Sequence, residues 1–182
     1  TFLAKSEYFT SPGPKGLLKK LTFIALGQVP VDRSGGRRSE AALITGLKVL
    51  ADGNTALTAF VPTDRAFRKL VRYLTGKAPK SEDAITNAVL SLGSATLEKV
   101  LLYHVVVGNP ILSPDALKAN GATLTSANAQ TFKVNVNGST ITLVDKVSKH
   151  TNAVVLLSKI DINGGNKQVA HGINQVMLPK LS

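Results

Sequence analysis

The chain of 182 residues is 43% hydrophobic and 18% charged, which suits one globular domain and excludes a protein that is disordered as a whole. It contains no cysteine, which excludes disulfides, a thiolate nucleophile and a cysteine-ligated metal site. The net charge of +11 predicts attraction to anionic partners, and residues 54–80 alone hold six Lys or Arg against one Asp or Glu. No signal-peptide pattern and no membrane-length apolar run is visible, so we expect any export to depend on a signal outside this chain.

The first 53 residues predict helices on either side of a loop. Residues 16–27, GLLKKLTFIALG, place apolar side chains on one helical face and Lys19 and Lys20 on the opposite face. Two interpretations remain open, a helix packed on the core and a helix lying on a membrane surface. A second helix is expected over residues 40–51, with Ser39 as its N-cap.

This N-terminal segment resembles an internal part of bacterial glycerolipid acyltransferases of the lysophosphatidate type. The resemblance rests on FLAKSEYF, GQVPVDRSGG and EAALITGLKVLADGN, and it implies that Arg33 contacts the phosphate of an acyl acceptor. The family's catalytic histidine, which an aspartate follows five positions later, is missing because no histidine precedes His104. No general base is therefore available to deprotonate an acceptor hydroxyl. Arg33 is then either a phosphate ligand without an enzyme or a surface arginine.

Residues 58–67, TAFVPTDRAF, predict a buried strand that leads directly into a helix. Pro62 lacks an amide hydrogen and should end the strand. Thr63 is a suitable N-cap, and Asp64 places a negative charge in the first helical turn, where the helix dipole favours it. Asp64 therefore either stabilises its own helix or contacts a partner. The apolar face expected for this helix consists of Phe67, Leu70, Val71 and Leu74.

A second stripe on the same predicted helix is cationic, and it consists of Arg65, Arg68, Lys69 and Arg72. None of these residues has an acidic residue four positions later that would neutralise it. The stripe is therefore either a site for phosphate or sulfate groups or a solvated helix face. A nucleic-acid partner is disfavoured, because aromatic residues for base stacking are sparse and no nucleic-acid module is visible.

The remaining elements predict an α+β fold, because helices come early and strands come late. Ser81 should cap a helix that ends at Gly93, and Thr96 should cap the next helix, which runs into Tyr103 and His104. A short helix follows, with Ser113 as its cap and Asn120-Gly121 at its end. Strands are expected over residues 105–107, 131–135, 140–144, 153–162 and 169–178, with a hairpin turn at Asn137-Gly138.

The segments TAFVPTDRAF, LLYHVV and HGINQVMLP, in this order, resemble the signature blocks of the fasciclin domain over about residues 54–182. The resemblance implies a twisted wedge or sandwich of β-sheets with helices along one side, and a non-enzymatic adhesion module outside the cell or at its surface. It also implies that Tyr103 and His104 contribute to adhesion, whereas the alternative is that they form buried hydrogen bonds at a helix-to-strand corner. Expected partners are a protein or an anionic polysaccharide, with an anionic membrane surface as a further option.

The two resemblances meet within residues 49–57, which fit either family. Three hypotheses follow: a fasciclin-type binding module, a phospholipid-binding remnant of an acyltransferase, and a hybrid chain without a selected function. We expect no cofactor and no metal, because the three histidines lie apart from carboxylate clusters. We expect His171 to satisfy backbone groups.

Overall fold

The computed structural model describes residues 54–181 of the chain, and strand β1 lies at the centre of its first sheet. β1 (Leu57–Pro62) pairs antiparallel with β2 (Val105–Val107) and parallel with β7 (Gln168–Ile173). All six residues of β1 are buried, because apolar side chains pack against both of its faces. This explains why the strand has an almost continuous apolar sequence, LTAFVP, in place of a simple alternation of apolar and polar residues.

The second sheet is antiparallel and has the strand order β3-β4-β5-β6. Its strands are β3 (Thr123–Thr125), β4 (Thr131–Asn137), β5 (Thr140–Val144) and β6 (Ala153–Val154). The hairpin predicted at Asn137-Gly138 is confirmed, since Asn137 pairs with Thr140 and joins β4 to β5. Gly138 has a φ of 59°, a left-handed conformation that glycine adopts without a steric cost.

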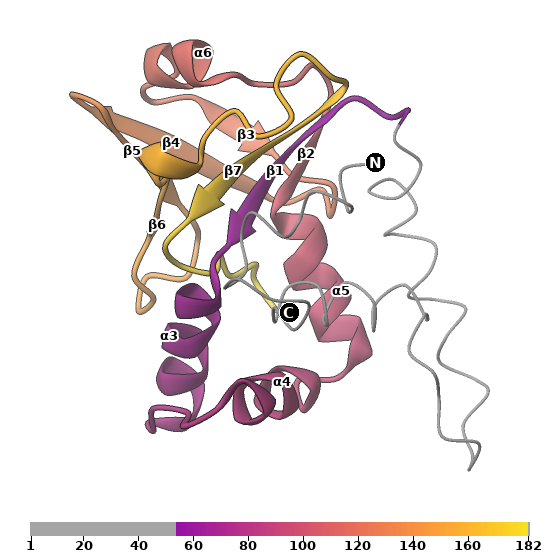
Figure 1. The fold of residues 1–182 in the computed structure, drawn as a ribbon, viewed down its shortest axis with the longest axis vertical. Coiled ribbons are helices and arrows are strands. Elements are labelled where there is room, and N and C mark those ends of the chain that lie inside the picture. Colours follow the sequence, from indigo (N-terminus) through magenta and orange to yellow (C-terminus); the bar gives the residue numbers. More distant parts are fainter. Residues whose placement is uncertain (1–53, 182) are drawn as a thin grey trace.

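The helices confirm the predicted α+β class and its arrangement. In Figure 1, α3 (Asp64–Thr75), α4 (Glu82–Leu90) and α5 (Ser94–Tyr103) lie together at one end of the two sheets, and α6 (Ser113–Lys118) lies near the opposite end. The 3-10 turn η2 (Leu157–Lys159) connects β6 to the segment that precedes β7. Within residues 54–181, no helix is both long enough and apolar enough to cross a bilayer.

Two hydrophobic cores share strand β1. Leu57, Ala59 and Val61 pack into the core between the first sheet and helices α3 to α5. Phe60 belongs to the other core, which lies between the two sheets and contains Phe132, with the two rings edge to face at 5.7 Å between centroids. Because β-strand side chains alternate between faces, one strand contributes to both cores at once.

The N-caps predicted for α3 and α4 are confirmed. The Thr63 hydroxyl oxygen accepts a hydrogen bond from the Ala66 amide at 3.3 Å, and the Ser81 hydroxyl oxygen accepts one from the Ala84 amide at 3.1 Å. Each bond satisfies one of the amide groups that a helix leaves unpaired in its first turn. The strand before α3 ends at Pro62, as the sequence predicts.

Two expectations about the middle helices are wrong. Helix α4 ends at Leu90, and Gly93 is the N-cap of α5, where its carbonyl oxygen accepts from the Leu97 amide at 3.0 Å. The cap expected from Thr96 is wrong because the helix has already begun at Ser94. Gly93 has a φ of 82°, and this left-handed conformation turns the chain directly from one helix into the next.

The two late strands are shorter than expected. Only Ala153 and Val154 pair with β5, because Val155 already forms a bridge to Ile173 of the other sheet. At this point the chain crosses from the second sheet to the first, and so β6 does not continue beyond Val154. Strand β7 ends at Ile173, and the Asn174 side-chain oxygen instead accepts a hydrogen bond from the Val154 amide at 2.9 Å.

Candidate functional site

The four cations predicted on α3 are all exposed, and we call Arg65, Arg68, Lys69 and Arg72 the basic face. The opposite side of the helix is buried through Ala66, Phe67, Leu70 and Val71. This geometry follows from the helical period, which separates the two stripes that the sequence carries. The structure therefore brings the four cations together on one helix surface, as expected, but Leu74 is 45% exposed and does not continue the buried stripe.

The partners of the basic face are few and uncharged. Arg68 donates to the Pro79 carbonyl at 3.1 Å, and Lys69 donates to the Asn174 carbonyl at 3.0 Å. Within residues 54–181, no hydrogen bond or ion pair involves the side chain of Arg65 or Arg72. The positive charge of this surface is therefore available to anionic groups of a partner. Asp64, in the first turn of the helix, is half-buried.

Tyr103 and His104 lie at the helix-to-strand corner where the sequence places them, but both are buried. Tyr103 is 0% exposed, its hydroxyl donates to the Thr131 carbonyl at 3.1 Å, and its ring contacts Phe132 edge to face. Burial, together with the negative charge of Asp145, raises the pKa of Tyr103 to about 12. The hydroxyl is therefore a neutral donor that ties α5 to the start of β4.

His104 is 5% exposed, and both of its ring nitrogens have backbone partners. Nδ1 lies 2.7 Å from the Val100 carbonyl oxygen, and Nε2 accepts a hydrogen bond from the Met177 amide at 2.9 Å. Since Nε2 accepts, the proton must be on Nδ1, which donates to Val100. Burial lowers the pKa of His104 to about 4, against the opposing effects of the Val100 carbonyl and of Asp145. The ring thus fastens the C-terminal segment to α5.

The adhesion role expected for Tyr103 and His104 stays a prediction, and the contacts of both residues limit how they could fulfil it. Neither side chain reaches the surface, so a direct contact with a partner would require the corner to open. The hydrogen bonds of both residues match the structural alternative stated above.

A third cluster links His171, Asp161 and Ser113. Nε2 of His171 donates to the Ile111 carbonyl at 2.8 Å, and Nδ1 accepts from the Asp161 amide at 3.3 Å. Ser113 donates to the Asp161 carboxylate twice, from its amide at 2.8 Å and from its hydroxyl. The Ser113 hydroxyl therefore bonds to the aspartate and not to the histidine, so this trio lacks the serine–histidine contact of a nucleophilic triad.

The same cluster corrects one sequence expectation. Ser113 does not cap α6, because the helix begins at Ser113 itself and Leu112 occupies the cap position. The Asp161 carboxylate holds the start of α6 from a distant loop, where Asp161 has a φ of 52°. His171 satisfies backbone groups, as expected, and burial lowers its pKa. Within the described residues, no three His, Asp or Glu side chains gather in an arrangement that could hold a metal ion.

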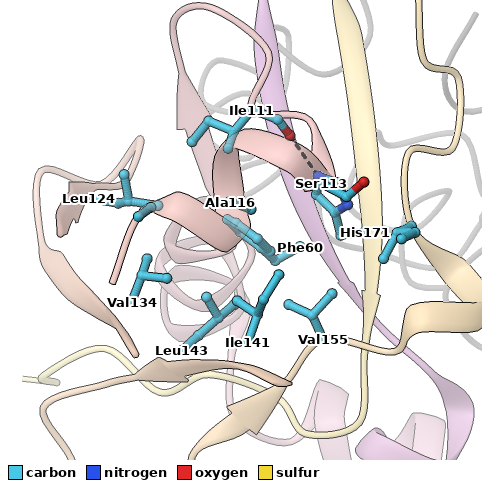
Figure 2. A pocket seen from close by; sticks show the side chains of 12 residues that line it. Phe60, Ile111, Ser113, Ala116, Leu124, Val134, Ile141, Leu143, Val155 and His171 are labelled. Atoms are coloured by element: carbon cyan, nitrogen blue, oxygen red, sulfur yellow. Dashed lines mark hydrogen bonds between the residues drawn. The ribbon is translucent and has the colours of Figure 1, made fainter. Parts of the chain in front are cut away.

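A small apolar cavity lies beside this cluster (Figure 2). Figure 2 shows Phe60, Val134, Ile141, Leu143 and Val155 around it, and a dashed line marks the bond between Ile111 and His171. The cavity has a volume of about 30 Å³. Sites for small molecules usually measure about 300–1,000 Å³, so this space is a packing gap between the sheets.

The remaining predicted site residue, Arg33, lies outside the described residues, as do Lys19, Lys20 and the whole acyltransferase-like segment. The phosphate contact expected of Arg33 and the hybrid origin of the chain stay predictions. The division of the chain into residues 1–53 and 54–182 likewise stays a prediction.

Comparison with known proteins decides the family. The model of the fasciclin domain matches residues 39–179, which is most of the chain. The chain belongs to the fasciclin domain family. The match begins at residue 39, inside the N-terminal segment for which an acyltransferase-like origin stays a prediction.

One solved structure that is similar to this fasciclin chain is a FAS1 domain pair from the insect cell adhesion molecule fasciclin I. The two sequences are 17% identical, the TM-score is 0.48, and the match covers 88% of this chain and 45% of that chain. This fasciclin chain therefore spans less than half the length of that domain pair. No curated protein matches it.

Proposed function

We propose that the protein is a non-enzymatic binding module, outside the cell or at its surface, that holds an anionic polysaccharide on the basic face of α3. Membership of the fasciclin family supports the class of function, because these domains generally mediate protein or cell-surface interactions. The observation that carries the choice of ligand is the basic face itself. Four cations are exposed on one helix, and two of them have no hydrogen-bond or ion-pair partner among residues 54–181.

Polysaccharide sulfates and carboxylates fit this surface for a physical reason. Arginine presents several donors in a fixed fork that matches the oxygens of an anionic group, and charge-assisted hydrogen bonds are stronger than neutral ones. One polymer chain supplies many such groups, so several cations can bind at once. The attraction should weaken as salt screens the charges.

The test is retention on a resin that carries a sulfated polysaccharide, with elution by a salt gradient. We expect the double variant Arg65→Gln/Arg72→Gln to elute at lower salt and to bind about tenfold more weakly, given up to about 1 kcal/mol for each exposed charge pair. Neither side chain forms a hydrogen bond or ion pair with another described residue, so thermal unfolding of the variant should match that of the parent chain.

The matched control is Lys118→Gln/Lys133→Gln, which removes the same charge from exposed positions on α6 and β4. We expect this control to elute close to the parent protein. Equal shifts in the two double variants would mean that net charge alone causes retention, and the proposed site would be wrong. A parallel measurement with vesicles of anionic phospholipid separates a membrane partner from a polysaccharide.

A further inference from the structure

We propose that a groove beside the last turn of α3 binds an acidic amphipathic helix of a partner protein. The groove has a volume of about 540 Å³ and is open to solvent. It lies between α3, the loop that follows β5 and the C-terminal segment, and we define it by Tyr73, Leu74, Lys146, Lys149, Lys180 and Leu181. This proposal is independent of the polysaccharide proposal, because the groove and the basic face share no residue.

The groove combines exposed apolar surface with exposed positive charge. Tyr73 is 44% exposed, Leu74 is 45% exposed and Leu181 is 56% exposed, although all three are large hydrophobic residues. Exposed apolar side chains that gather in one concave place, unlike single scattered ones, indicate a contact surface. Leu74 continues the apolar period of α3 beyond the buried part of the helix, so its side chain is free to pack against something else.

Side-chain hydrogen bonds to the backbone hold the walls of the groove in place. The Asp145 carboxylate accepts hydrogen bonds from the Val147 amide at 2.9 Å and from the Leu178 amide at 3.0 Å, so it joins the two walls. Gln130 fixes the C-terminal wall, because its side-chain oxygen accepts from the Lys180 amide at 2.9 Å and its nitrogen donates to the Lys180 carbonyl at 3.0 Å. A preformed groove loses less conformational entropy on binding.

The same contacts decide how a partner can bind. The amide and carbonyl of Lys180 are already bonded to Gln130, and Pro179 has no amide hydrogen. An extended peptide therefore cannot add to this segment as a further strand, because strand addition needs free backbone groups. Side chains remain for recognition, and a helix that lays an apolar face into a groove uses side chains alone.

Charge decides the character of that helix. Lys146, Lys149 and Lys180 are exposed, and within residues 54–181 no ion pair joins any of them to a carboxylate. A partner helix with acidic residues beside its apolar stripe would match them, and complementary charge of this kind favours both encounter and specificity. The chain's own first 53 residues hold eight Lys or Arg against four Asp or Glu, so their charge is wrong for this place.

The experiment uses the full chain and a fluorescent helical peptide with leucines at i, i+3, i+4 and i+7 and glutamates beside them. Fluorescence anisotropy should show saturable binding that weakens as salt rises. We expect Lys146→Glu/Lys149→Glu and, separately, Leu74→Gln to weaken binding at least about tenfold, as for residues that anchor an interface. The control Lys118→Glu/Lys167→Glu should change the affinity by less than about twofold. Lys118 lies on α6, and Lys167 precedes the residue that pairs with Leu57 at the start of β1, whereas α3 and the groove follow the end of that strand.

Two readouts establish whether the peptide lies in this groove. Amide NMR shifts on peptide addition should cluster at residues 146–149 and 178–181. Arg65→Gln, about two helical turns from Tyr73, should bind the peptide within about twofold of the parent protein. The proposal is overturned if a peptide with serine in place of leucine binds equally well, since charge alone would then suffice. It is also overturned if the shifts lie elsewhere. A fatty acid is the alternative occupant of an apolar groove with lysines beside it, so binding of oleate in the groove without binding of the peptide would overturn the proposal too.

Discussion

At the scale of single residues, the buried ring of His104 should make the stability of the protein depend on pH. Its pKa is about 4 in the folded chain and about 6.5 when exposed. Between these values the unfolded chain binds a proton that the folded chain does not, so the free energy of unfolding falls as pH falls. Above pH 6.5 the ring is neutral in both states and contributes no pH dependence.

We therefore expect the free energy of unfolding to drop by about 2–3 kcal/mol from pH 7 to pH 4.5, measured by urea unfolding at each pH. His171, whose pKa burial also lowers, acts in the same direction. The variant His104→Gln, which keeps one donor and one acceptor, should be less stable at pH 7 but show a flatter dependence on pH. An unchanged slope in that variant would show that His104 is not the group that titrates.

At the scale of elements, helix α3 shows how much of the structure the sequence predicts. The cap at Thr63, the buried positions Phe67 and Leu70, and the exposed cations all follow from residue type and helical spacing. The exposure of Leu74 does not follow, because its spacing predicts burial and yet the side chain is 45% exposed. Residue spacing predicts which side of a helix is apolar. How many turns of that side are buried depends on parts of the chain that are distant in sequence.

The contrast within α3 is directly testable, because Leu70 and Leu74 are the same residue type one turn apart. Leu70 is 2% exposed and Leu74 is 45% exposed. Leu70→Ala should lower the free energy of unfolding by about 2–5 kcal/mol, and Leu74→Ala should lower it by less than about 1 kcal/mol. Both values come from the same urea titration. Similar losses in the two variants would contradict the observed burial, and with it the idea that Leu74 serves a partner.

The same limit applies to the candidate sites. The sequence identifies the basic face and the Tyr103-His104 corner, because both are local patterns. It gives no sign of the groove, whose walls come from residues 73–74, 146–149 and 178–181 and meet only in the folded chain. Nor does it show the Asp161 contact with Ser113, because two side chains 48 positions apart carry no shared pattern. Buried hydrogen bonds between distant loops were the part that could not be predicted.

At the scale of the whole molecule, strand β1 joins the two cores. Leu57, Ala59 and Val61 belong to the helix-side core, and Phe60 belongs to the core between the sheets. Loss of either core therefore removes the packing of a strand that the other core needs. We expect residues 54–181 to unfold in one cooperative transition, as small single domains usually do.

Hydrogen exchange provides the measurement. Phe132→Leu alters only the core between the sheets, and it should lower protection of amides in α3 and α4 by the same factor as amides in β4 and β5. The variant Leu70→Ala alters the helix-side core. It should lower protection of amides in β4 and β5 by the same factor as amides in α3 and α4. If α3 and α4 keep their protection while β4 and β5 lose it, the two cores open separately and β1 does not couple them.

The pairing of β1 with β7 also affects how the protein is made. Ala59 lies beside Ala170, so the central strand waits for a partner that is synthesised 111 residues later. Until residues 168–173 leave the ribosome, one edge of β1 is an open template for strands of other molecules, with apolar side chains on both faces. Synthesis adds about 5–20 residues per second, so the edge of β1 stays unpaired for seconds on each nascent chain. Protection of that edge by a chaperone should matter more for the yield of this protein than for its final stability.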